Sequence, residues 1–362
     1  MNVLNKIADS FRWRFSYFRD KVTKKATFAL LRLGSGNMFW ARFYYFFWDK
    51  SFQRENRAVI KGKLEHEEGF SSGNLNEYKL RRNIHRIEKG LIMPDRKPVF
   101  AEGYLRETIK AFSQEIDLSK GEKNGLLKWA FDVLSLYFQS VDNKNDTVFF
   151  AFKDFKEIIE KYKFDEEEIS NVPYYRKKLE DDPSLFSYES FWTLCKQRVS
   201  VRFFENKPVE RELLDKAFKV ALQSPSACNR QPFEFLVFTK ESDIDKYIQL
   251  PGGVKGYEQG VPVLIFLIGD LSAYFDERDR HLIYIDGGLA AMSFMLALES
   301  LGLASCPLNW PDVEEREVKI EKELNMSYHK RCIMAFVVGY PDNDRQVPFS
   351  QKKGTEDVVK YF

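Results

Sequence analysis

SPSACNRQPFEFLVFT, residues 224–239, is the stretch that decides the fold of the second half of this chain. Its first part is rich in Ser, Asn and Pro, which favours a tight turn, and Pro225 stops the helix predicted before it. The apolar, largely aromatic run 233–239 predicts a strand. Asn229 and Gln231 each carry a donor and an acceptor, so the turn can also serve a flat polar ring. Taken alone, turn formation explains this composition.

Helices and strands alternate on either side of this stretch. The pattern predicts a helix over residues 209–223, strands over 261–269 and 332–339, and a long helix over 284–301 between those two strands. The small residues Gly287 to Ala291 are interpreted as a place of close helix packing. The second half of the chain is therefore predicted to be α/β or α+β.

Two further clusters can bind a ligand together with the turn. In QRVSVRFF the polar residues Arg198, Ser200 and Arg202 alternate with valines, so an extended backbone would point all three to one side. Guanidinium groups on that side suit a phosphate. LGLASCPLNW, residues 301–310, is predicted to be a loop whose backbone N–H groups approach the same ligand.

The first 190 residues predict a mainly helical region. A helix begins near Glu77 and ends between Gly90 and Pro94, with one apolar face made of Leu80, Ile84, Ile87 and Leu91. Further helical patterns cover 126–138 and 154–163, and the acidic stretch 165–183 is interpreted as a linker. The basic face of the first helix carries residues that either hold an anionic substrate or are solvated: Arg81, Arg82 and Arg86.

Positive charge is concentrated near the N-terminus. Residues 1–50 contain ten Lys or Arg and three Asp, although the formal net charge of the chain is only +2. Aromatic residues accompany these cations, so the segment suits the surface of an anionic membrane; the alternative is packing on the chain's own core or on a partner subunit. The residues concerned are Trp13, Phe39, Trp40, Phe43, Tyr44, Phe46, Phe47 and Trp48, with Arg12, Arg14, Arg19, Lys21, Lys24 and Lys25.

Several classes of protein are not expected. The four Cys and four His lack the spacing of a metal site, so no metal and no disulfide framework is predicted. Neither a signal peptide nor a transmembrane helix is predicted, and we expect a cytoplasmic chain, with a peripheral contact at the inner membrane face through residues 1–50. No nucleic-acid-binding signature accompanies the basic residues, so nucleic acid is not an expected partner.

The clusters and the elements between them occur in a familiar order. Arg-x-Ser-x-Arg-x-Phe, a helix, Pro-Ser-x-x-Asn-x-Gln-Pro-aromatic, a strand, DGGLAAMSFMLALESLGLAS and a strand ending in Gly-Tyr-Pro resemble the nitroreductase family of FMN enzymes over about residues 194–362. The resemblance implies an α+β fold with a central, mostly antiparallel sheet flanked by helices, preceded here by a mainly α-helical region. We therefore divide the chain into residues 1–50, 51–190 and 191–362.

The resemblance also implies which residues bind FMN, and no catalytic side chain is among them. Val199 stands where a second basic residue is common in the family, and Phe233 replaces a frequent Trp. The implied cofactor-binding residues, including a basic pair near the C-terminus that would meet the phosphate, are Arg198, Ser200, Arg202, Ser226, Asn229, Gln231, Pro307, Leu308, Asn309, Lys352 and Lys353.

The implied function is that of an FMN-dependent oxidoreductase. It would take hydride from NADH or NADPH and pass it to an unidentified acceptor by a ping-pong mechanism, as a homodimer with the flavin at its interface. A second hypothesis is a weakly catalytic or non-catalytic flavin-binding scaffold at the membrane surface. It is favoured by Val199, by the long helical extension and by the basic aromatic N-terminus, and it would belong to a polysaccharide biosynthetic pathway. NIHRIEKGLIMP resembles segments of nitroreductase-like proteins found with bacterial surface-polysaccharide pathways, which suggests an anionic sugar-type or lipid-linked substrate near Arg81, Arg82 and Arg86.

Overall fold

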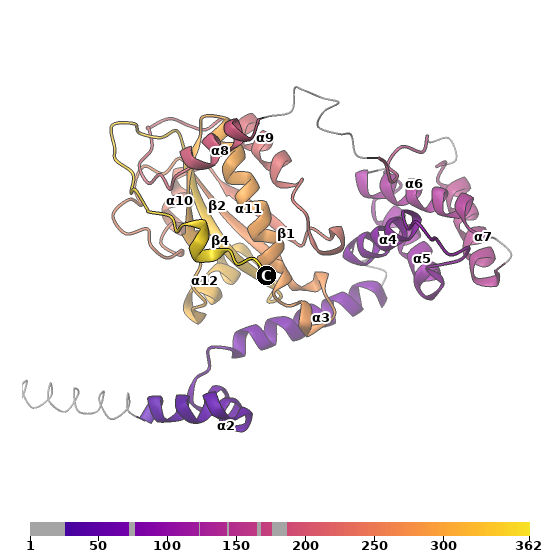
Figure 1. Ribbon diagram of the computed structural model, residues 1–362, viewed down its shortest axis with the longest axis horizontal. Coiled ribbons are helices and arrows are strands. Elements are labelled where there is room, and N and C mark those ends of the chain that lie inside the picture. The colour runs from indigo at the N-terminus through magenta and orange to yellow at the C-terminus, as the bar shows by residue number, and fades with distance from the viewer. Residues whose placement is uncertain (1–25, 72–76, 123, 143–144, 165–167, 176–186) are drawn as a thin grey trace, which may run out of the picture. The chain divides into compact units, whose positions relative to one another are not determined.

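The computed structural model of the protein describes residues 26–71, 77–122, 124–142, 145–164, 168–175 and 187–362. The chain divides into two compact units. Figure 1 labels helices and strands along the chain. One contains the chain up to Arg57 together with Asp312–Glu314, and the other contains Ala58–Pro311 and Glu315–Phe362.

The described part of the first unit is helical. Residues 26–36 form a helix, followed by α2 (Met38–Phe43), a π-helical turn η1 (Tyr44–Trp48) and the start of α3 (Gln53–Ser71). Asn37 begins α2 because its side chain accepts the N–H of Phe39 at 2.8 Å. Tyr44 is buried, whereas most neighbouring aromatic side chains are exposed.

The second unit contains a helical region that confirms the prediction for the first half of the chain. It consists of α4 (Glu77–Leu91), α5 (Glu102–Leu118), α6 (Gly125–Ser140) and α7 (Asp146–Lys161). Leu80, Ile84 and Ile87, predicted on one face of α4, have no exposed surface and join a common core. The sequence patterns did not single out α5, and most of the predicted linker 165–183 lies outside the described residues.

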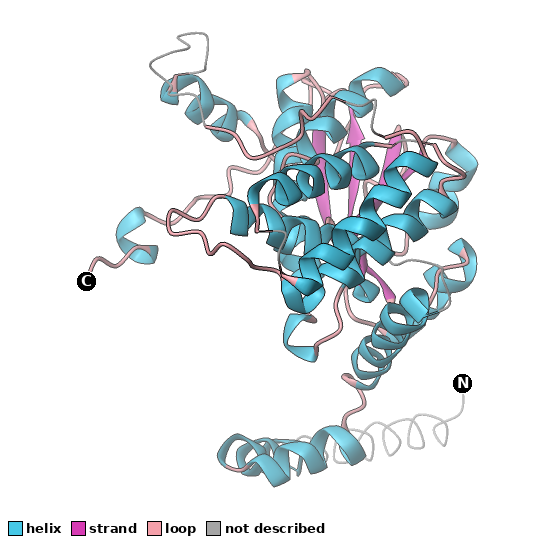
Figure 2. Ribbon diagram, turned by 90° about the vertical axis from the view of Figure 1, so that its right-hand side faces the viewer, coloured by secondary structure: helices cyan, strands magenta, loops and turns pink. Residues whose placement is uncertain are grey.

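The rest of the second unit is built on a four-stranded antiparallel sheet with accompanying helices (Figure 2). Its order is β1-β2-β4-β3, with β1 at Phe233–Phe238, β2 at Val263–Asp270, β4 at Lys330–Gly339 and β3 at Ala304–Asn309. This arrangement confirms the α+β class and the three predicted strands. The accompanying helices are α8 (Tyr188–Gln197), α9 (Arg211–Ala221), α10 (Glu241–Tyr247), α11 (Leu282–Ser300), α12 (Glu314–Leu324) and α13 (Thr355–Val358).

Strand β2 is buried on both sides. Leu264, Phe266 and Ile268 belong to one hydrophobic core, and Val263, Ile265 and Leu267 belong to another core that includes residues of α9 and α11. The even and odd residues of a strand point to opposite faces, so helices must cover both faces of this sheet. The run 261–269 is continuously apolar for that reason.

The prediction of a loop over residues 301–310 is wrong, because Ala304–Asn309 form strand β3. The strand contains Pro307, which cannot donate to a strand ladder. It is tolerated here because β3 lies at the end of the four-stranded order, where a missing N–H is least costly.

By length and composition α11 could cross a bilayer, within the stretch Glu277–Ser300. Half of its most apolar window is buried inside the fold. Phe294 and Leu298, for example, have no exposed surface and pack in the core beside β2. Its apolar character is therefore that expected of a core helix.

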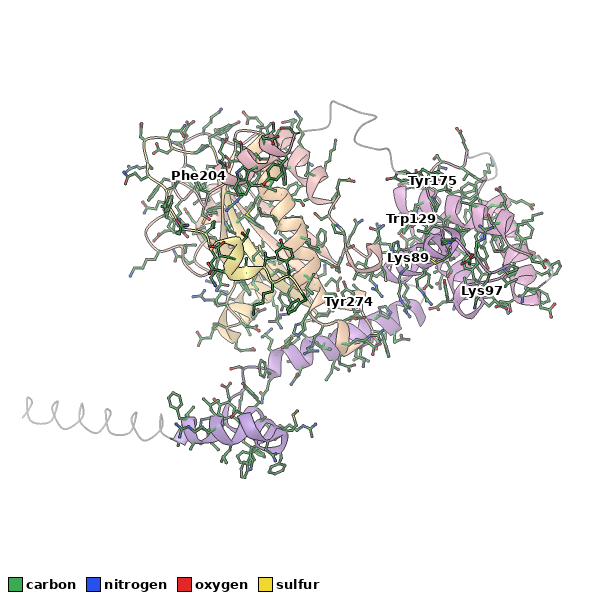
Figure 3. The ribbon with its side chains drawn as sticks, in the orientation of Figure 1. Lys89, Lys97, Trp129, Tyr175, Phe204 and Tyr274 are labelled. Atoms are coloured by element: carbon green, nitrogen blue, oxygen red, sulfur yellow. The ribbon has the colours of Figure 1, made fainter. Side chains whose placement is uncertain are left out.

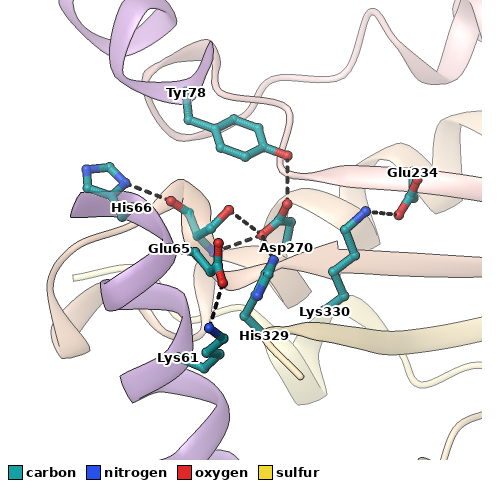
Figure 4. Close-up of polar contacts among 9 residues, drawn as sticks. Lys61, Glu65, His66, Tyr78, Glu234, Asp270, His329 and Lys330 are labelled. Atoms are coloured by element: carbon teal, nitrogen blue, oxygen red, sulfur yellow. Dashed lines mark hydrogen bonds and ion pairs between the residues drawn. The ribbon is translucent and has the colours of Figure 1, made fainter. Parts of the chain in front are cut away.

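Polar contacts at Asp270 join the helical region to the sheet (Figure 4). The carboxylate of Asp270, at the end of β2, accepts the hydroxyl of Tyr78 at 3.3 Å and the N–H and hydroxyl of Ser272 at 2.8 and 2.6 Å. Nδ1 of His66, on α3, lies 2.7 Å from the carbonyl oxygen of Ser272. Residues of α3 and α4 are thus fixed to the segment that follows β2.

Candidate functional site

The first predicted cluster lies directly beside strand β3. Ser200 forms a parallel bridge with Ser305, and the N–H of Val201 donates to the carbonyl of Ser305 at 3.1 Å. This backbone pairing brings Arg198 and Arg202 to the strand that carries Pro307, Leu308 and Asn309. The first and third clusters, about a hundred residues apart in sequence, are therefore adjacent in space.

The two arginines of this cluster have donors available to a ligand. Nη1 of Arg198 is buried and has no hydrogen-bond partner in the described part of the chain. Nη1 of Arg202 donates to the Ser200 carbonyl at 3.3 Å, and its guanidinium lies 5.7 Å from the centre of the Tyr257 ring. Burial raises the pKa of the neighbouring Cys306 thiol, and the charge of Arg202 opposes that rise. A buried, unsatisfied guanidinium donor is costly unless an acceptor meets it.

Residues of the third cluster differ in exposure. Leu308 is buried in the core and pairs with Ala335 in the ladder between β3 and β4. Asn309 is exposed, and its carbonyl accepts the N–H of Gly252 at 2.7 Å.

The second cluster is a tight turn around η3 (Ala227–Asn229). Cys228, Asn229 and Gln231 have φ values of 54°, 52° and 52°, which is rare for residues other than glycine. The Ser226 hydroxyl accepts the N–H of Gln231 at 3.0 Å, and Nε2 of Gln231 donates to Oδ1 of Asn229 at 3.0 Å. The three predicted ligand residues of the turn thus fix one another, and strain of this kind is common at binding sites.

The first and second clusters lie at opposite ends of α11. The N–H of Ala227 donates to Asp286 at 3.0 Å, near the start of the helix. Burial raises the pKa of Glu299, near its end, and Gln197 and Arg198 beside it oppose that rise. Thirteen residues of helix separate Asp286 from Glu299, roughly 20 Å at 1.5 Å per residue. Within one chain the two clusters therefore do not meet.

The predicted basic pair, Lys352 and Lys353, is exposed in the segment between β4 and α13. Both side chains are open to solvent and available to an anionic group.

Comparison with known proteins fits this arrangement of strands and clusters. The family model described as "Nitroreductase family" matches residues 195–251 and 259–340, which contain the first three clusters. The matched residues carry the similarity to the nitroreductase family, and residues 195–340 are called the nitroreductase-family domain. Residues before 195 lie outside the match, so the helical region is an addition to that domain in this chain.

The curated relatives compared with the nitroreductase-family domain are iodotyrosine deiodinases. Iodotyrosine deiodinase 1 of Sus scrofa is 24% identical over 226 residues, covering 54% of this chain and 76% of its own. Iodotyrosine deiodinase of Thermotoga neapolitana is 28% identical over 194 residues, covering 47% of this chain and 96% of its own. Among solved structures, an FMN-dependent nitroreductase from Clostridium difficile is 24% identical with a TM-score of 0.40, covering 46% of this chain and 96% of its own.

The three arginines predicted to bind a substrate do not all line the same cleft. Arg82 and Arg86 line one cleft with Arg230 of the nitroreductase-family domain. Arg81 instead lies 3.8 Å from Glu77 and lines a different hollow, with Trp129 and Asn229. Arg230 lies inside the turn motif at 224–233, but residue type and spacing alone do not connect it with α4.

Proposed function

We propose that the protein is an FMN-dependent oxidoreductase that takes hydride from NADH or NADPH and passes it to a second substrate by a ping-pong mechanism. The observation that carries the proposal is the first cluster, in which Nη1 of Arg198 is buried and unpartnered among the described residues beside Ser200 and Arg202. A match to the nitroreductase family over the same residues supports it.

The residues of the first cluster fit the phosphate end of FMN. A phosphate dianion can accept from both Arg198 and Arg202, and the hydroxyl of Ser200 can add a third donor. Lys352 and Lys353 are free to add charge from the C-terminal segment. When bound, FMN supplies the hydride chemistry. The positive charge of Arg202 and the exposed amide of Asn309 would stabilise negative charge on a ligand beside β3.

We further propose a two-fold homodimer built on α11. Ile285, Leu289 and Met292 are 54%, 44% and 41% exposed, and their spacing places them on one face of the helix. In a two-fold dimer that pairs this face with itself in antiparallel fashion, the start of one α11 lies near the end of the other. The turn around η3 of one subunit would then approach the first cluster of its partner, although the two are far apart within a chain.

Absorbance spectroscopy tests the proposed activity. The purified chain, reconstituted with FMN, is expected to show flavin absorbance that bleaches with NADH or NADPH and returns when an acceptor is added. Titrating each nicotinamide separately identifies the donor. Because the curated relatives are iodotyrosine deiodinases, iodotyrosine is one acceptor to offer beside nitroaromatics and quinones. A colourless protein after reconstitution contradicts the proposal, and flavin that no nicotinamide bleaches favours a scaffold.

We also propose that the chain works in the cytoplasm, at the inner face of a membrane. Phe39, Phe46 and Phe47 in α2 and η1 are 66%, 68% and 64% exposed. Exposed aromatic rings in a segment with an excess of Lys and Arg suit the headgroup region of an anionic bilayer.

A further inference from the structure

A cleft of about 600 Å³ lies between α4 and the turn around η3. One wall consists of polar residues of α3 and α4, and the other contains Ala227, Cys228 and Arg230 of the nitroreductase-family domain. The segment around Phe275 closes one side. Figure 3 labels Lys89, on the α4 wall, and Tyr274, whose ring lies under Arg230. The cleft is large enough for a small organic molecule.

The charges that line the cleft are unequally paired. Its four carboxylates all have cationic neighbours: Glu67 lies 3.5 Å from Lys79, Asp276 and Asp279 lie 3.6 and 3.8 Å from Arg278, and Glu107 acts on Arg82. By contrast, Arg82, Arg86 and Arg230 form no salt bridge among the described residues, although the charges of Glu107 and Asp286 act on Arg82 and Arg230. With Lys79, Lys89 and Arg278 included, six cationic side chains therefore line one cleft with four carboxylates.

These guanidinium groups are held in place by contacts other than ion pairs. Arg230 is only 6% exposed; its guanidinium lies 4.9 Å from the centre of the Tyr274 ring and its Nε has no partner among the described residues. The guanidinium of Arg86 lies 3.7 Å from the centre of the Tyr104 ring. Stacking of this kind fixes the plane of a guanidinium while leaving N–H groups at its edge for a ligand.

Two further observations indicate which chemical groups the cleft can bind. Burial lowers the pKa of Arg82, and the neighbouring charges of Arg86 and Arg230 lower it further, so these like charges lie close enough to repel one another. Asn83 is 1% exposed and its side-chain oxygen has no partner in the described part of the chain. The cleft thus offers several donors to an anion and one acceptor to a hydroxyl group.

We propose that this cleft binds a phosphate or diphosphate ester, with its phosphoryl oxygens on Arg82, Arg86 and Arg230. One guanidinium satisfies a single carboxylate. A phosphoryl group has three oxygens and about two negative charges, so it can bind three guanidinium groups at once. Ala227 and Cys228 belong to the turn proposed to approach a flavin, so the organic part of a bound ester would lie beside that turn. That placement rests on the proposed function; the binding itself does not.

Calorimetric titration of the FMN-loaded full chain with inorganic pyrophosphate tests the site. We expect saturable binding that weakens at least tenfold in Arg82→Gln/Arg86→Gln and is unchanged in the control Arg106→Gln, an exposed arginine of α5. Glycerol 3-phosphate and dihexanoyl phosphatidate then distinguish the source of the ester. Tighter binding of the phosphatidate assigns a lipid headgroup, and equal binding assigns a water-soluble ester.

Two outcomes overturn the proposal. One is the absence of saturable binding of any of the three probes to the folded wild-type chain. The other is pyrophosphate binding that Arg82→Gln/Arg86→Gln leaves intact and Arg198→Gln abolishes, since the probe would then occupy the predicted FMN site. Flavin absorbance and a melting curve are recorded on the same samples. A colourless chain that still binds pyrophosphate through Arg82 and Arg86 refutes the proposed function and retains the anion site.

Discussion

The carboxylate of Asp286, 3% exposed near the start of α11, accepts the hydroxyl of the buried Tyr274 at 2.9 Å. The same oxygen accepts the N–H of Ala227 at 3.0 Å, so one side chain fixes both the turn around η3 and the segment after β2. The sequence had suggested only close helix packing for this part of α11. The start of α11 therefore contributes hydrogen bonds through Asp286 in addition to helix packing.

Replacing Asp286 should therefore destabilise the protein. Asp286→Ala leaves a buried hydroxyl and a backbone N–H without their acceptor, at about 1–3 kcal/mol each, and we expect a loss of roughly 2–5 kcal/mol in the free energy of unfolding. Asp286→Asn keeps an acceptor oxygen and should lose less. Denaturant unfolding of both variants measures the free energy of unfolding. Equal stability of Asp286→Ala and the wild type would contradict a stabilising role for the hydrogen bonds of Asp286.

Arg198 should contribute to flavin affinity. Its unpartnered Nη1 is available for one charge-assisted hydrogen bond, worth about 1.5–3 kcal/mol, so Arg198→Gln should raise the Kd for FMN roughly tenfold to a hundredfold. Fluorescence titration measures the Kd. Arg211→Gln is the matched control, since the side chain of Arg211 is 89% exposed and lies 3.5 Å from Asp215. Equal weakening in the two variants would argue against a phosphate contact.

The exposed face of α11 should be the dimer interface. Leu289→Lys places a charge in that face, where desolvation would oppose association, and we expect a monomer in light scattering together with a large loss of bound FMN. Val318→Lys, on α12, introduces the same charge at a residue of similar exposure and should remain dimeric. A Leu289→Lys protein that stays dimeric and yellow would exclude this face.

His66 should make the protein less stable as the pH falls. Burial lowers the pKa of His66 to about 4; Lys79 and Arg230 also lower it, while Ser272 and Glu67 oppose the shift. The imidazole binds a proton near pH 6.5 in the unfolded chain but only near pH 4 in the folded chain, so stability is lost from pH 6.5 downward. Between pH 7 and 5 this costs about 2 kcal/mol. Unfolding at both pH values should show a smaller loss for His66→Gln, and an unchanged loss would rule out His66.

The aromatic residues of η1 should bind membranes. Phe46→Ser/Phe47→Ser removes two exposed rings from the basic segment and should reduce sedimentation with vesicles of anionic phospholipid several-fold. Phe149→Ser/Phe150→Ser is the matched control, because these rings on α7 are 53% and 52% exposed. If both double variants bind vesicles like the wild type, the aromatic surface serves another partner.

The sequence by itself determined the local elements and their type. The spacing of Leu80, Ile84 and Ile87 predicted the buried face of α4, and the continuous apolar run 261–269 predicted a buried strand, because both signals depend only on neighbouring residues. The motif order from Arg198 to Gly339 was enough to predict the α+β class. Local patterns failed at β3, because a loop was predicted over residues 301–310. The place of this strand at the edge of the sheet explains why it tolerates Pro307.

Tertiary structure alone decided which of these residues come together. Ser200 meets Ser305 through a backbone bridge, and Arg82 and Arg86 share a cleft with Arg230, although no sequence spacing relates α4 to the turn. Packing likewise places the turn and Arg198 near opposite ends of α11, so these two clusters do not meet within one chain. The physical reason is that periodicity reports which face of an element is buried, whereas the partner of that face is fixed by packing between distant segments.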